Sequence, residues 1–275
     1  MTKRIDYYYL PKKFRKKHDF CEFVINDIER LVIDETFVEL KTQIINLPEN
    51  LKIENDTQDH IFDILQANGL RVEHNQIIRT HLLLSLIMET CYFLQESLLC
   101  SLKMRMTVCF TLLRKPFLEI SILLMRILNE SDFIERFSNE DGFDPIKTTP
   151  NQKKGLIEKT NNFLNNKFQP DDLFDYIFSK EFGDSLFNLT NNAIHLYTDR
   201  NPIVATEKQN LNFIFSTWED IEAQWEYIYE NLPMLISFIA DVIEVLVFKS
   251  TSVDEKIFIG RLKKRDKMRK KYNVS

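Results

Sequence analysis

Glycine is scarce in this chain, with only five glycines among 275 residues and none adjacent to another. Phosphate-binding loops need several glycines within one turn, because the backbone must approach the phosphate closely. The sequence therefore has no P-loop and no dinucleotide-binding fingerprint. Because glycine also supplies most backbone turns with positive φ, its scarcity favours long helices joined by few loops.

Paired cysteines are absent as well. The four cysteines, at positions 21, 91, 100 and 109, show no C-x-x-C spacing of the kind that structural zinc sites use. We therefore expect no metal and no cofactor. The economical interpretation is four free, buried thiols in a reducing compartment.

Targeting and membrane signals are also missing. Residues 1–10 carry charges and tyrosines in place of an apolar signal core. Two apolar stretches, 77–102 and 232–248, are interrupted by polar residues such as Glu89 and Asp241. A charge near a bilayer centre costs about 3 kcal/mol or more, so these stretches fit buried bundle helices better than membrane spans. The sequence predicts a cytoplasmic protein without a membrane.

Helical spacing of apolar residues dominates the rest of the chain. It predicts an all-α fold, a single multi-helix bundle around a long central helical pair that is interrupted at Pro116. A short helix should end at Asn68. The other expected helices cover about residues 11–32, 35–45, 73–102 continuing to 129 with the interruption at Pro116, 151–166, 171–180, 184–198, 216–231 and 233–248. Capping boxes of Ser216 with Glu219 and of Ser252 with Glu255 should open the helix at 216 and the last helix.

Charge divides the chain into three expected parts. Residues 1–18 form a basic segment of net charge +6, residues 256–275 a basic helix or tail of +8, and residues 19–255 a helical bundle domain of −19. The basic ends could bind nucleic-acid phosphate, dock on the acidic body of this protein, or remain solvated. Candidate phosphate-binding residues at the C-terminal end are Lys263, Lys264, Arg265, Lys270 and Lys271.

Two cations precede the predicted helix break. Arg114 and Lys115 lie directly before Pro116 in an otherwise apolar segment. A guanidinium suits a fixed pairing with a carboxylate on a neighbouring helix, and it equally suits an anion site. Both interpretations stay open for Arg114, and Lys115 is a second candidate anion ligand.

A second group of polar residues surrounds His195. Asn191 precedes this histidine by four positions, and Arg200 follows it by five. The imidazole could serve as a general acid or base, and Arg200 could bind an anion. A histidine that is simply hydrogen-bonded within the bundle is the alternative.

The segments 112–116, 191–195 and 210–215 together resemble uncharacterised bacterial helical proteins that are themselves similar to the HEPN superfamily. That resemblance implies metal-independent RNA cleavage by an arginine, a polar residue and, after three intervening positions, a histidine. Asn191 and His195 occupy the polar and histidine places, whereas Thr190 occupies the place of the arginine. Arg114 or Arg200 would have to supply the guanidinium. The resemblance also implies a role in bacterial stress or phage defence.

Two functional hypotheses follow. The first is an interaction or structural module, with a protein partner or a second copy as its ligand and nucleic acid as a further partner of the basic ends. The second is a HEPN-like ribonuclease with a degenerate motif, in which His195, Asn191 and Arg114 are the catalytic residues.

Overall fold

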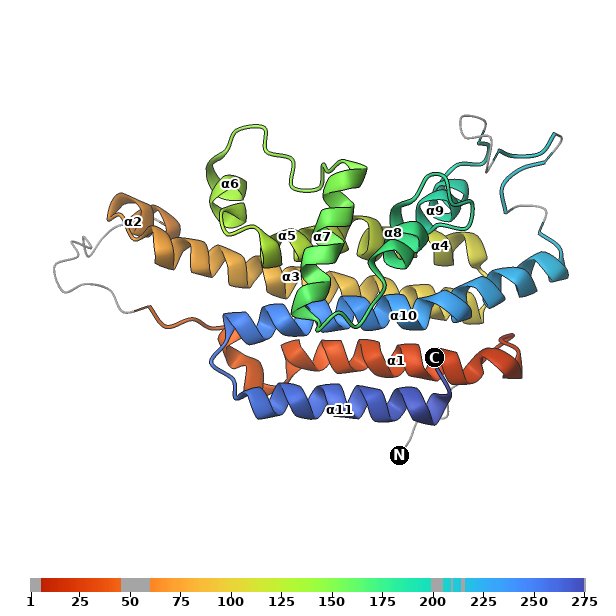
Figure 1. The fold of residues 1–275 in the computed structure, drawn as a ribbon, viewed down its shortest axis with the longest axis horizontal. Helices are drawn as coiled ribbons and strands as arrows, with labels where there is room; N and C mark the ends of the chain where they lie inside the picture. Colours follow the sequence, from red (N-terminus) through yellow and green to blue (C-terminus); the bar gives the residue numbers. More distant parts are fainter. Residues whose placement is uncertain (1–5, 46–59, 199–204, 209, 214–215, 275) are drawn as a thin grey trace.

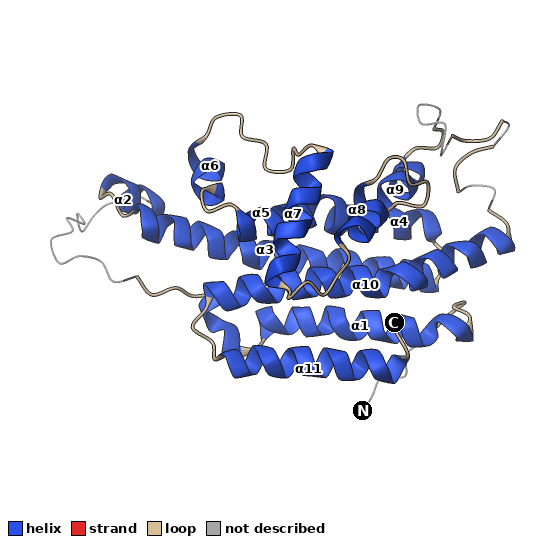
Figure 2. Ribbon diagram, in the orientation of Figure 1, coloured by secondary structure: helices blue, strands red, loops and turns tan. Residues whose placement is uncertain are grey.

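Every regular element that the structure describes is a helix, as the apolar spacing predicts (Figure 2). The computed structural model describes residues 6–45, 60–198, 205–208, 210–213 and 216–274. Its helices are α1 (Lys12–Ile33), η1 (Glu35–Leu40), α2 (Ile61–Ala67), α3 (Arg71–Leu102), α4 (Met106–Arg114), η2 (Lys115–Ile120), α5 (Ser121–Asn129), α6 (Phe133–Asn139), α7 (Pro150–Phe163), α8 (Pro170–Phe178), α9 (Leu186–Ile194), α10 (Trp218–Ser250) and α11 (Glu255–Tyr272).

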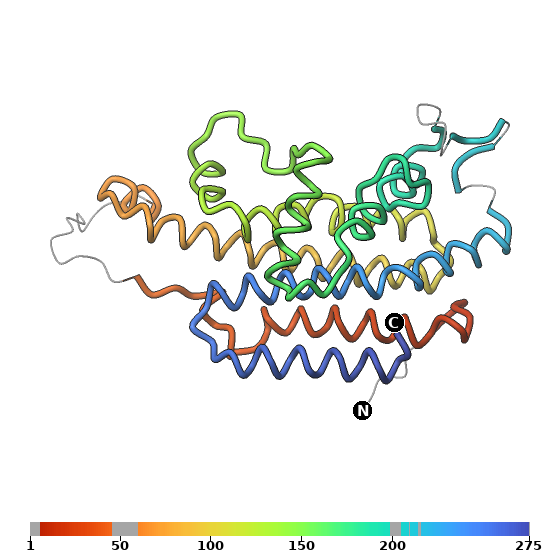
Figure 3. Tube along the Cα trace, in the orientation of Figure 1, coloured from red at the N-terminus to blue at the C-terminus, as the bar shows by residue number. Residues whose placement is uncertain are grey.

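Long helices run side by side through the molecule. α1 lies between α10 and α11, and it also packs against α3 (Figures 1 and 3). The segment α4 to α5 turns back and packs along α3, while α7, α8 and α9 form a second layer over it. One continuous apolar core joins these layers, and its largest fully buried side chains include Trp225, Tyr229, Phe20 and Phe117. The all-α bundle prediction is confirmed.

The central helical pair reverses direction at residues 103–105, ahead of Pro116. Met104 adopts a left-handed backbone conformation with φ of 59°, and the Arg105 amide donates to the Cys100 carbonyl at 2.9 Å. The sequence prediction, which places the only interruption at Pro116, misses this turn. Because Met104 is not a glycine or asparagine, the sequence carries no ordinary signal for positive φ there.

Pro116 widens the helix without ending it. Residues Lys115–Ile120 form a π turn that is continuous with α4 and α5, and the Ser121 amide bonds to the Pro116 carbonyl five residues back. Proline lacks an amide hydrogen and its ring crowds the preceding turn, so a locally wider helix accommodates it. Pro233 lies inside the single α-helix α10, where the sequence predicts two helices.

Helix starts lie within about two residues of the predicted ones, whereas some ends come earlier than predicted, such as that of η1 at Leu40 in place of 45 and that of α9 at Ile194 in place of 198. The capping box of α10 is formed by Thr217 and Asp220, one position beyond the predicted Ser216 and Glu219. The last helix is capped by Asp254, whose side chain accepts from the Lys256 amide. In both places several polar residues compete for the cap, and spacing alone does not choose between them.

Within the described part of the chain, two helices, α3 and α10, are long and apolar enough by composition to cross a bilayer. Their burial differs. In α10, 78% of the most apolar window is buried inside the protein, which is the environment of a core helix. In α3 the corresponding share is 44%, so more of its apolar surface is left uncovered.

Candidate functional site

Arg114 ends α4 beside the last turns of α9. Its Nη1 donates to the side-chain oxygen of Asn191 at 2.8 Å and to the hydroxyl of Thr190 at 3.3 Å. The guanidinium is half-buried. Sequence reasoning expected a carboxylate partner or an anion, whereas the partners are a neutral amide and a hydroxyl. The positive charge of Arg114 is therefore not neutralised by these two bonds, and no ion pair joins it to a carboxylate of the described residues.

His195 terminates α9, one turn beyond Asn191. Its amide donates to the Asn191 carbonyl at 2.9 Å, while its own backbone is extended and its side chain exposed. The structure thus joins Arg114 directly to Asn191 and joins Asn191 to His195 through the backbone. No direct hydrogen bond connects Arg114 with His195 among the described residues. Arg200 lies outside the described residues.

A network of amides and hydroxyls fixes the backbone beyond α9. The Asn212 amide nitrogen donates to the His195 carbonyl and to the Thr198 hydroxyl, both at 2.8 Å. The Thr206 hydroxyl in turn donates to the side-chain oxygen of Asn212 at 2.7 Å. Because the His195 carbonyl is held in this way, the residue leaves the helix in a defined direction.

Beside this network lies an open, polar hollow of about 440 Å³. Asn192 and Asn212 line it from the α9 side, and Gln224 lines it from α10. The side-chain oxygen of Gln224 is buried without a hydrogen-bond partner among the described residues. Sequence reasoning missed Gln224 and Thr206, because an isolated glutamine or threonine in a helix or loop carries no motif.

Lys115 points away from α9. Its ammonium pairs with Glu89 of α3 and lies 4.7 Å from the ring centre of Phe93. These contacts join the start of η2 to α3. The structure therefore separates Lys115 from its neighbour Arg114, although the two adjoin in sequence, because successive helical positions differ by about 100° in direction.

The basic C-terminal run forms α11, which packs on α1 and α10. Lys263, Lys264, Lys270 and Lys271 are exposed, and the Lys264 ammonium lies 3.4 Å from Asp27. Arg265 is different, because its side chain is only 5% exposed. This geometry matches the docking of α11 on the acidic body and leaves Arg265 out of reach of an external phosphate.

Three buried carboxylates surround Arg265. Its two terminal nitrogens bond to Asp27 at 3.2 Å, to Asp241 at 3.0 Å and to Glu244, whose Oε2 is 2.6 Å from Nη2. Burial by itself lowers the pKa of the guanidinium, but the hydrogen bond to Glu244 and the charges of all three carboxylates outweigh it and raise the pKa. Arg261 adds a 2.7 Å bond to Glu244.

Metal-binding groupings are absent from the described part of the chain, where no three side chains of His, Cys, Asp or Glu converge as ligands. All four cysteines are buried and free, as the sequence predicts.

No family model, curated protein or solved structure matches this chain.

Proposed function

We propose that this protein is an interaction module that associates with a second copy of itself, in the bacterial stress or phage-defence setting that the HEPN resemblance implies. The observation that carries the proposal is the uncovered apolar surface of α3, whose most apolar window is 44% buried against 78% for α10. A large uncovered apolar patch on an ordered helix is typical of a contact surface.

The contact surface consists of Met88, Tyr92, Phe93 and Leu99, here called the α3 outer face. Tyr92 is 50% exposed, and the other three are partly exposed and lie outside the main core cluster. Met88, Tyr92 and Leu99 follow one another at intervals of four and seven positions, which places them on one side of the helix. Tyrosine, phenylalanine and methionine are enriched in protein interfaces.

Part of the charge at the edge of this face is neutralised within one chain. Glu89 and Lys115, at its edge, already neutralise each other within one chain. A copy that packs against the face therefore meets no unpaired charge from this pair, and like charges are a main obstacle to self-association.

The test is sedimentation velocity across a concentration series. The native chain should dimerise, and Tyr92→Glu should weaken dimerisation at least tenfold, because it places a charge in the apolar contact. Ile44→Glu is the matched control, since Ile44 is 91% exposed and lies outside the α3 outer face. A native chain that stays monomeric at all concentrations contradicts the proposal, as does equal association of the Tyr92 variant.

The cellular setting can be tested with the same pair of variants. Bacteria that express the native chain should show fewer phage plaques than cells with an empty vector. Tyr92→Glu should abolish that difference and Ile44→Glu should preserve it. Unchanged plaque numbers with the native chain across a broad phage panel would remove the defence setting from the proposal.

Metal-independent RNA cleavage is the second candidate function, favoured by the 2.8 Å bond from Arg114 to Asn191. In this proposal His195 accepts the proton of the RNA 2′-hydroxyl as it attacks the adjacent phosphorus, and Arg114 stabilises the negative charge that develops. The bond from phosphorus to the 5′-oxygen breaks, the leaving 5′-oxygen takes a proton from water, and a 2′,3′-cyclic phosphate and a 5′-hydroxyl result. Arg114 supplies from α4 the guanidinium that the motif lacks at Thr190.

The cleavage test uses purified RNA with a chelator present. The native chain should cleave it, and His195→Ala should reduce the rate by at least a hundredfold. His81→Ala is the matched control, because His81 is an exposed histidine on α3, away from α9. Absence of native cleavage on structured and single-stranded RNAs, or equal rates for the His195 variant, rejects this function.

A further inference from the structure

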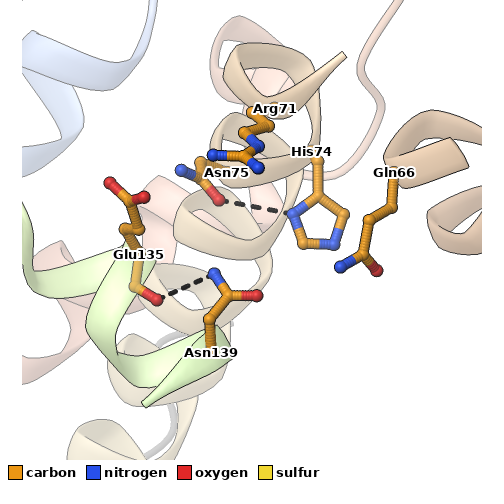
Figure 4. Close-up of a pocket in the computed structure, with 6 residues that line it drawn as sticks. All are labelled: Gln66, Arg71, His74, Asn75, Glu135 and Asn139. Carbon is orange, nitrogen blue, oxygen red and sulfur yellow. Dashed lines mark hydrogen bonds between the residues drawn. The ribbon is translucent and has the colours of Figure 1, made fainter. Parts of the chain in front are cut away.

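A small hollow of about 220 Å³ lies between α2, α3 and α6, away from the α9 region. Figure 4 shows side chains from three helices arranged around it. The lining residues are Gln66, Arg71, His74, Asn75, Glu135 and Asn139. The volume corresponds to roughly seven water molecules at about 30 Å³ each, and it lies below the range of about 300 to 1,000 Å³ that suits drug-sized ligands.

Both signs of charge are present around the hollow. Arg71 and His74 approach from α3, and Glu135 approaches from α6 (Figure 4). Among the described residues no ion pair or side-chain hydrogen bond engages the Arg71 guanidinium or the Glu135 carboxylate. Surface residues of opposite sign that line one hollow without pairing leave both charges available to a ligand.

Neutral groups of the lining are already oriented by internal bonds. The Asn139 amide nitrogen donates to the Glu135 carbonyl at 2.9 Å, and its side-chain oxygen points away from that bond (Figure 4). The His74 Nδ1 contacts the Asn75 side-chain oxygen at 3.3 Å, and the ring packs edge-on against Phe62 at 5.3 Å between centres. These contacts hold the imidazole in place before any ligand arrives.

We propose that this hollow binds a small zwitterion with an amino and a carboxylate group, of the size of a free amino acid. The ligand carboxylate bonds to Arg71, whose planar guanidinium can hold both oxygens. The ligand ammonium bonds to the Glu135 carboxylate. This binding site goes beyond the proposed function and does not depend on it.

The charge arrangement makes the choice of ligand specific. A simple anion would satisfy Arg71 but would face the carboxylate of Glu135, and a simple cation would satisfy Glu135 but would face Arg71. A zwitterion of the right length satisfies both, so a molecule that lacks either group should bind more weakly.

The test is a heteronuclear NMR titration of the full chain with each of the common L-amino acids. At least one should give saturable shifts at residues 66, 71–75 and 135–139. Its analogues lacking the amino or the carboxylate group should bind at least tenfold more weakly. Arg71→Ala and Glu135→Gln should each weaken binding of the preferred amino acid at least tenfold.

Glu73→Gln is the matched control. Glu73 is a carboxylate on α3 that does not line the hollow, so its variant should bind as the native chain does. Arg71 and Glu135 are exposed, and replacing them removes no core contact. The proposal is overturned if no amino acid gives saturable shifts, if the analogues bind equally well, or if the Arg71 and Glu135 variants bind like the native chain.

Discussion

Arg114 donates a 2.8 Å hydrogen bond to Asn191, a residue 77 positions further along the chain. This bond joins α4 to α9 and holds a half-buried cation against Asn191, which lies one helical turn before His195. The guanidinium has no carboxylate partner among the described residues, so the amide orients the charge without cancelling it. The bond therefore serves the helix packing, and it leaves the cation free to attract a phosphate.

Replacing Asn191 with alanine should destabilise the protein by about 1–2 kcal/mol. A hydrogen bond from a charged group contributes about 1.5–3 kcal/mol, and partial exposure of Arg114 reduces that figure. Urea unfolding followed by circular dichroism measures the change. Thr111→Ala, an exposed replacement on α4, should stay within about 0.5 kcal/mol of the native chain. Equal stabilities of the Asn191 variant and the native chain would contradict the assigned role of the bond.

Arg265→Met should cost about 3–5 kcal/mol, because it leaves Asp27, Asp241 and Glu244 buried around an apolar side chain. Thermal unfolding measured by calorimetry should show a clearly lower transition temperature. Lys263→Met removes an exposed cation from the same helix and should leave the transition nearly unchanged. If both variants melt alike, the buried carboxylates do not depend on Arg265.

Tyr229→Phe should cost about 1–3 kcal/mol, although it removes a single oxygen atom. The fully buried Tyr229 hydroxyl lies 3.0 Å from both the His18 Nδ1 and the Ser101 hydroxyl, and its loss leaves these two polar groups without this partner. Chemical unfolding provides the measurement. Tyr92→Phe, at a half-exposed tyrosine, should cost less than about 0.5 kcal/mol. A neutral Tyr229 replacement would show that water or another group takes over both bonds.

Stability should fall as the pH rises from about 9 to about 12. Burial raises the pKa of the Cys91 and Cys109 thiols from 9.0 to about 12 in the folded protein. In that window the unfolded chain releases these protons and the folded chain keeps them, so rising pH favours unfolding. Urea midpoints at pH 8.5 and 10.5 measure the effect. A Cys91→Ala, Cys109→Ala double variant should show a smaller fall, and an identical fall would exclude the thiols as its cause.

Apolar spacing was sufficient to predict the helical class and most helices, because each long helix repeats the pattern several times. In α1, for example, Phe20, Val24, Ile28 and Leu31 are all buried, at intervals of four, four and three. Short-range features were harder to predict. The reversal at Met104 depends on one unusual backbone angle, and the cap of α10 moved by one residue among similar polar side chains.

Single residues of the candidate site could be predicted from the sequence, but their arrangement in space could not. Sequence reasoning selected Arg114 and Asn191, and the structure brings their side chains into contact. The C-terminal lysines and arginines looked alike in sequence, yet Arg265 is buried and Lys263 is exposed. Only the fold decides which residue of a basic helix faces the carboxylates of other helices. The lining of the hollow between α2, α3 and α6 comes from three separate segments, so no local pattern could indicate it.

The carboxylates around Arg265 also affect the order in which the helices can pack during synthesis. Asp27 belongs to α1 and Asp241 and Glu244 to α10, whereas both arginines that pair with them lie in α11. On the ribosome, residues 261–265 are made after every other part of this cluster. Lys167 already pairs with Asp241, but until α11 emerges Asp27 and Glu244 have no cation partner among the described residues, and the seam between α1 and α10 carries two uncompensated negative charges. The nascent chain therefore completes its bundle only when its last helix is available.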